Sequence, residues 1–116
     1  MALGSLESQI MDVLWAAEKP LTVRETLEAL NQDRTPPLAY TTVLTVMSRL
    51  AEKGALTRTA LGRGHAYAPA AADEAALAVQ DVLRTYGDAA VSHFLDQASN
   101  DPALRERLQA LLEEGS

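Results

Sequence analysis

Short hydroxyl side chains and one arginine recur in the stretch 38–53, at a spacing that would place them on one face of a helix. These positions are Thr41, Thr42, Thr45, Ser48 and Arg49. Hydroxyls donate and accept hydrogen bonds, a threonine methyl packs on a thymine methyl, and the arginine fork fits the edge of guanine. Glutamate and lysine form helix better and are the usual residues of a solvated face. The stretch therefore predicts a helix that reads the major groove of DNA. A threonine-rich surface helix is the alternative.

The other side of this stretch is apolar and would hold the helix in place. Val43, Val46, Met47 and Leu50 recur at i, i+3, i+4 and i+7, the spacing of a buried helical stripe. Gly54 follows Lys53, and glycine adopts the left-handed conformation that ends many helices. We therefore expect one helix over 38–53, with an inner apolar face and an outer polar face.

Two shorter helices are expected before it and a β-hairpin after it. Ser5 is a candidate N-cap for a first helix that ends before Pro20, and Trp15 is expected in the core or at a seam. Thr22 and Glu25 have the spacing of a capping box, which predicts the start of a second helix. The runs 56–61 and 65–69 flank a Gly-Arg-Gly tip and predict a hairpin.

Helix, helix, helix and hairpin is the element order of a winged helix-turn-helix domain. The third helix would enter the major groove, and Arg63 at the hairpin tip would touch phosphate or the minor groove. A solvated turn is the alternative for Arg63. Lys53 and Arg58 complete the expected DNA-binding set.

Beyond residue 70 the chain changes character, with three amphipathic helical segments, and Asp101 as N-cap with Pro102 at the first helical position predicts the start of the last one. Association with a second copy would bury their apolar stripes, and folding back on the chain's own helices is the alternative. We expect a winged-helix DNA-binding domain over 1–70 and an α-helical dimerisation region over 71–116. The overall class is mainly α with a small β-hairpin. The expected dimerisation positions are Val79, Val82, Leu83, Tyr86, Val91, Phe94, Leu95, Leu104, Leu108 and Leu111.

Charge is divided between these two parts of the chain. The whole chain has a net charge of −6, but residues 1–69 hold seven basic and seven acidic residues. The segment 34–69 holds five basic residues and one acid, a net charge of +4, while residues 70–116 hold three basic residues and nine acids. The whole-chain value thus hides a basic segment that contains the expected recognition helix and wing.

Several classes of function find no support in the residues. There is no cysteine, so disulfides, thiolate metal sites and cysteine nucleophiles are excluded. His65 and His93 lack the further ligands of a metal site, and no catalytic constellation emerges. We expect no metal, no cofactor and no enzymatic activity. Without a signal peptide or a membrane-spanning run, we expect a cytoplasmic protein that does not insert into membranes.

Four segments in order resemble the penicillinase-repressor (BlaI/MecI-type) family of transcriptional regulators. They are LGSLESQIMDVLWAAEKPLTVRE, LAYTTVLTVMSRLAEKGALTR, GRGHAYAP and VSHFLD. The resemblance covers nearly the whole chain. It implies a homodimeric repressor that binds a dyad-symmetric operator through an N-terminal winged helix and dimerises through C-terminal helices. The operator contacts that it implies fall on Thr41, Thr42, Thr45 and Arg49.

The resemblance also suggests how such a repressor is released. In β-lactam-responsive members a membrane sensor-transducer protein signals, and the repressor is cut within its dimerisation region. The susceptible bond there is typically Asn-Phe, and the aligned pair here is His93-Phe94. Copper-sensing members carry a cysteine-rich tail, which this sequence lacks. Two alternatives stay open: a ligand- or metal-sensing repressor released without cleavage, and a winged-helix protein-interaction module that does not bind DNA.

Overall fold

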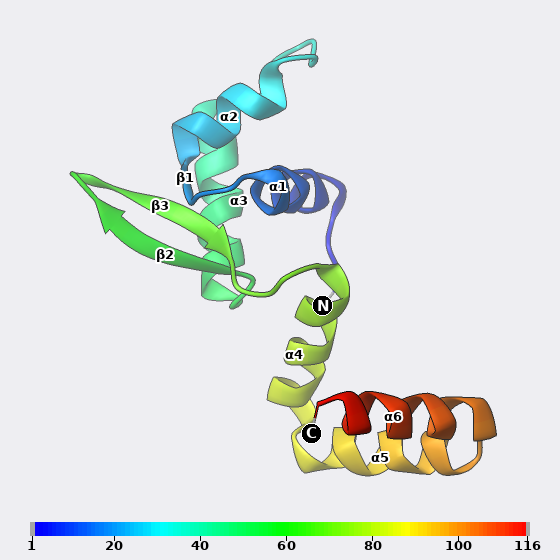
Figure 1. Ribbon diagram of the computed structural model, residues 1–116. Helices are drawn as coiled ribbons and strands as arrows, with labels where there is room; N and C mark the ends of the chain where they lie inside the picture. Colours follow the sequence, from blue (N-terminus) through cyan, green and yellow to red (C-terminus); the bar gives the residue numbers. More distant parts are fainter. Residues whose placement is uncertain (1, 116) are drawn as a thin grey trace. The chain divides into compact units, whose positions relative to one another are not determined.

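The computed structural model describes residues 2–115, which form two compact units, the first ending at Ala78 and the second beginning at Val79. Its elements confirm the predicted class, a mainly helical chain with a small β-sheet and the winged helix-turn-helix order (Figure 1). In chain order the elements are α1 (Ser5–Ala16), β1 (Leu21–Thr22), α2 (Val23–Asn31), α3 (Tyr40–Glu52), β2 (Leu56–Leu61), β3 (Gly64–Pro69), α4 (Glu74–Tyr86), α5 (Asp88–Ser99) and α6 (Pro102–Glu114). The first unit contains every element from α1 to β3 together with the start of α4.

The core of the first unit lies between α1, α3 and the sheet. Three members of the predicted α3 stripe, Val43, Met47 and Leu50, are fully buried, and Val46 packs half-buried beside them. Their partners are apolar side chains from α1, α2, the turn after α3, β2, β3 and α4: Ile10, Met11, Leu14, Val23, Ala55, Leu56, Tyr67 and Leu77. Burial of this stripe is what fixes the rotation of α3 about its own axis.

Helix α3 begins at Tyr40, later than the predicted start at residue 38. The side-chain amide of Asn31 explains the difference. It accepts a hydrogen bond from the Leu38 N–H (2.8 Å) and donates one to the Leu38 carbonyl oxygen (3.1 Å). These bonds occupy the Leu38 backbone outside the helix, and Ala39 then takes the extended N-cap conformation.

The predicted hairpin is present, and a third strand joins it. Strands β2 and β3 pair antiparallel from Leu56↔Pro69 to Leu61↔Gly64, around a tip where Gly62 has φ 60° (Figure 1). Few residues other than glycine tolerate that angle. Strand β1 adds to the other edge of β3 through Leu21↔Tyr67. The hairpin, unstable alone, is thereby attached to the chain just before α2.

The N-cap of α2 agrees with the sequence prediction, and the N-cap of α1 differs from it. The Thr22 hydroxyl accepts the Glu25 N–H at 3.1 Å, and the Glu25 carboxylate accepts the Thr22 N–H at 3.0 Å, which confirms the predicted box. For α1 the predicted N-cap, Ser5, is wrong, because Gly4 precedes the helix. The reason is Glu7, whose carboxylate accepts the Gly4 N–H at 2.9 Å.

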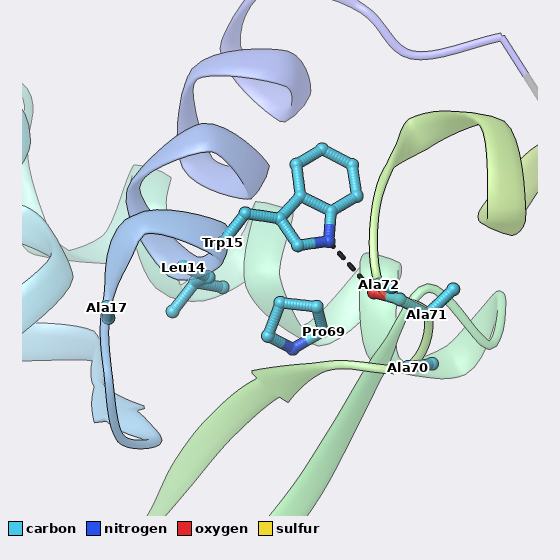
Figure 2. Close-up of a pocket in the computed structure, with 7 residues that line it drawn as sticks. All are labelled: Leu14, Trp15, Ala17, Pro69, Ala70, Ala71 and Ala72. Atoms are coloured by element: carbon cyan, nitrogen blue, oxygen red, sulfur yellow. Dashed lines mark hydrogen bonds between the residues drawn. The ribbon is translucent and has the colours of Figure 1, made fainter.

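Trp15 lies at a seam, as the sequence predicts. Its indole Nε1 donates a 2.9 Å hydrogen bond to the Ala71 carbonyl oxygen, so α1 is joined to the segment that follows β3 (Figure 2). Leu77, farther along that segment, is only 3% exposed and belongs to the same core. The first unit therefore runs on through Ala78, and the division of folding domains after residue 70 stays a prediction.

The second unit contains the rest of α4 together with α5 and α6, and the last two pack side by side (Figure 1). Asp101 caps α6 by accepting the Leu104 N–H at 3.2 Å, with Pro102 in the first turn as predicted. Within this unit's described residues only Ala98 is buried. Its large apolar side chains are thus left at least partly open to solvent. None of the helices within residues 2–115 has the length and apolar character to cross a membrane.

Candidate nucleic-acid interface

The outer face of α3 presents the hydroxyl and arginine side chains that the sequence places there. Thr41, Thr42, Thr45 and Arg49 are exposed, and Ser48 is half-buried. Because the opposite stripe is fixed in the core, this face keeps a constant orientation relative to the rest of the first unit. An exposed helix with short polar side chains can approach base edges closely.

The start of α3 is fixed by α2 and the loop between them. Helix α2 packs against α3, and the Asn31 amide holds the backbone at Leu38, where the loop returns. In the same loop the Arg34 guanidinium donates a hydrogen bond to the Gln9 side chain on α1. The loop between α2 and α3 is therefore held in two places, at Leu38 just before α3 and at Arg34 within the loop.

The hairpin supplies two further cations. Arg63 at the tip and Arg58 on β2 are both exposed. Within residues 2–115, no carboxylate forms an ion pair with either of them or with Arg49. Their charges are therefore uncompensated by neighbouring acids, which suits contact with a polyanion.

Lys53 has a different environment from the other predicted contacts. Its ammonium lies 3.7 Å from the Glu7 carboxylate of α1, and its side chain is 54% exposed. This pair connects the end of α3 to the first turn of α1. Lys53 thus has a structural partner that the sequence did not indicate.

Another pair, Arg24 and Tyr40, was missed at the sequence level. The Arg24 guanidinium lies 5.3 Å from the centroid of the Tyr40 ring, an arrangement typical of a cation–π contact. Tyr40 is the first residue of α3 and is 41% exposed. The only sequence signal was an aromatic residue directly before the threonines. Its partner on α2 could be recognised only after the two helices were placed.

The predicted dimerisation positions lie on α4, α5 and α6, and most are exposed in the single chain. Leu104 and Leu108 are half-buried. The exposed ones are Val79, Val82, Leu83, Tyr86, Val91, Phe94, Leu95 and Leu111. Side chains of this size left open to water over one small unit favour burial against another surface.

The bond between His93 and Phe94 lies inside α5, and both side chains are exposed. A helical backbone does not fit the extended conformation that most proteases bind, so cleavage there requires local opening of α5. In the part of the chain that the structure describes, no group of three His, Cys, Asp or Glu side chains could hold a metal ion.

Comparison with known proteins gives a consistent result. A family model described as penicillinase repressor matches residues 3–114. The transcriptional regulator BlaI of Mycobacterium tuberculosis, in strains CDC 1551 / Oshkosh and ATCC 25618 / H37Rv, is 41% identical over 118 residues. The match covers 94% of this chain and 84% of the relative. A solved structure described as the complex structure of hsRosR-S1 has a TM-score of 0.54 and 17% sequence identity, covering 97% of this chain and 91% of its own. At that identity the structural likeness shows the fold alone.

Proposed function

The chain belongs to the penicillinase-repressor family of transcriptional regulators, and we propose from this premise that it is a homodimeric repressor of a dyad-symmetric operator. The family and the relatives are regulators and not enzymes, as the sequence predicts. In the proposed complex α3 lies in the major groove, and the β2–β3 wing contacts the backbone or the adjacent minor groove.

One observation supports this proposal most directly. Helix α3 buries an apolar stripe and leaves hydroxyls and Arg49 in solvent, while the arginines of the wing have no acidic partner within residues 2–115. A surface that bound another protein through this face would favour apolar or acidic residues. The segment 34–69 instead carries a net charge of +4. Base recognition by Thr41, Thr42, Thr45 and Arg49 would give specificity, and the remaining cations would add affinity.

Dimerisation is proposed to use the second unit. Its exposed apolar positions on α4, α5 and α6 would be buried by a second copy, and a two-fold dimer presents two recognition helices to two half-sites. The acidic residues of this part would keep it away from DNA. Promoter occlusion is the expected consequence of operator binding.

Release is proposed to follow from disruption of this dimerisation surface. One route is cleavage near His93-Phe94 after α5 opens, with a membrane sensor-transducer protein as the origin of the signal. The alternative is a small ligand or a metal that releases the dimer intact. Mass spectrometry of the protein recovered from induced cells distinguishes the two routes of release. Cleavage predicts one fragment that ends near residue 93 and another that begins near residue 94, whereas ligand or metal release predicts the intact chain.

The central test is selection of duplexes by the full chain from a random-sequence DNA pool. We expect enrichment of one dyad-symmetric sequence, and an affinity for it that falls steeply as salt concentration rises. Failure to enrich any sequence, together with no salt-dependent binding, would favour the winged-helix protein-interaction module instead. A selected sequence without dyad symmetry would contradict the dimeric arrangement but keep DNA binding.

A further inference from the structure

A groove of about 360 Å³ lies between the first turns of α2 and α3 on one side and the outer end of the wing, the β2–β3 hairpin, on the other. Arg24 of α2 and Tyr40 and Leu44 of α3 form its helical side. Leu61, His65 and Tyr67 form the side that belongs to the hairpin. The groove therefore separates the two elements that the proposed function assigns to DNA, namely α3 and the wing.

Among the described residues that line this groove, Arg24 is the one whose side chain carries a permanent charge. Within residues 2–115 its guanidinium forms no ion pair and no hydrogen bond, and its contact is the Tyr40 ring, whose centroid lies 5.3 Å away. The neighbouring carboxylate does not neutralise it, because Glu25 accepts the Thr22 N–H at 3.0 Å and lies 3.6 Å from the Lys19 ammonium. The guanidinium is thus positioned by an aromatic face while its N–H groups stay available.

The arrangement of DNA grooves identifies what would occupy this space. A helix in the major groove and a wing at the neighbouring minor groove are separated by one sugar–phosphate backbone. That backbone must pass between α3 and the hairpin, and the groove of the protein lies between these same two elements. Its phosphates carry the charge that complements Arg24, and its sugars suit the apolar side chains of Leu44 and Leu61.

We propose that this groove seats the sugar–phosphate backbone of one operator strand, with Arg24 as a phosphate contact held in place by the ring of Tyr40. His65, on the hairpin side, supplies a second hydrogen-bond donor to the same strand. The inference rests on the proposed function, because it requires that α3 and the wing bind DNA together. It assigns to Arg24 a role in affinity and to Tyr40 a positioning role.

The experiment measures the affinity of the full chain for the duplex that it selects from the random pool, over a range of salt concentrations. Arg24→Ala should weaken binding about tenfold for each half-site and lower the slope of log affinity against log salt by about 1.8, because the dimer loses one phosphate contact, worth about 0.9, at each of its two half-sites. Arg24→Lys should keep the slope. Tyr40→Leu should weaken binding with the slope kept, whereas Tyr40→Phe, which keeps the ring, should restore affinity. Arg107→Ala is the matched control, since Arg107 is an exposed arginine of α6 and does not line the groove.

A second measurement locates the contact on the DNA. Duplexes that carry a neutral methylphosphonate at single positions should show one backbone site in each half-site, between the recognised bases and the flank, where neutralisation weakens binding by the unaltered protein about tenfold. The Arg24→Ala variant should be insensitive at that site. An Arg24→Ala variant with unchanged affinity and slope, or with full sensitivity at that site, would overturn the inference while the proposed function stands. Absence of any salt-dependent binding by the unaltered chain would instead refute the proposed function.

Discussion

The indole Nε1 of Trp15 lies 2.9 Å from the carbonyl oxygen of Ala71 and donates a hydrogen bond to it. This bond crosses between the last turn of α1 and the segment that connects β3 to α4 (Figure 2). Together with buried Leu77, it makes that segment part of the winged-helix unit. The start of α4 is thereby held by the first unit, and only its later turns belong to the second unit.

Replacing Trp15 with phenylalanine should lower the free energy of unfolding of the full chain by about 1–2 kcal/mol, since a hydrogen bond is lost and the Ala71 carbonyl loses its partner. Denaturant unfolding followed by circular dichroism measures the change. Glu28→Gln, at an exposed position of α2, is the control and should stay within about 0.5 kcal/mol of the unaltered chain. Equal stabilities for Trp15→Phe and the unaltered chain would contradict the role given to this bond.

The capping box at the start of α2 should make stability depend on pH. The hydrogen bonds with Thr22, helped by nearby Lys19, lower the pKa of Glu25. A carboxylate whose pKa is lower in the folded state stabilises the fold above its unfolded pKa and loses that contribution as pH falls through its folded pKa. The stability difference between the unaltered chain and Glu25→Gln should therefore be constant above about pH 5 and shrink as the pH falls below about 4.3. Unfolding curves collected across that range measure it, and a difference that does not change with pH would contradict the prediction.

Arg49 should contribute to sequence recognition. If its guanidinium forks onto a guanine, Arg49→Ala should cost about 1–3 kcal/mol of binding free energy for each half-site and relax specificity at one base pair of each half-site. Binding to the selected duplex and to its single-base variants measures this. Arg107→Ala, an exposed arginine on α6, is the matched control and should leave the preferences unchanged. A loss of equal size on every variant duplex would make Arg49 a phosphate contact.

Arg63 should behave in the opposite way. It lies at the tip of the wing, so Arg63→Ala should weaken binding to all sequences alike and lower the salt slope by about 0.9 for each half-site. Binding of the variant and of the unaltered protein, measured over the same range of salt concentrations, gives both slopes. A slope that equals that of the unaltered protein would remove the wing tip from the interface.

The second unit should be the site of self-association. Leu83→Glu places a charge on an exposed apolar position of α4, and burying that charge in a dimer should weaken association by roughly 3 kcal/mol. Sedimentation equilibrium measures the dissociation constant. Thr85→Glu adds the same charge at an exposed polar position of the same helix and should change it far less. If both variants remain dimers as stable as the unaltered chain, the interface lies elsewhere.

The parts of the fold that sequence predicts are those set by neighbouring residues. The Thr22 and Glu25 box, the Asp101 cap and the α3 stripe each depend on side chains three or four positions apart. The orientation of Thr41 and Arg49 toward solvent follows from that stripe. These predictions need only helical geometry.

The features that sequence misses depend on residues far apart in the chain. Strand β1 contains only Leu21 and Thr22, too few for a periodic pattern, and it exists because β3 offers an open edge. The stacking of Arg24 on Tyr40 requires two helices to be placed first. The same holds for the ion pair of Lys53, which changes the surroundings of a predicted DNA contact.

The chain contains a single tryptophan, and the structure places it where two segments of the first unit meet. Indole fluorescence responds to the loss of a hydrogen bond and to entry of water, so its emission reports selectively on whether residues 69–72 stay docked on α1. Any event that pulls on the start of α4 would shift this natural signal. Undocking of residues 69–72 from α1 could thus be followed in real time in the unaltered protein, without a dye and without a substitution.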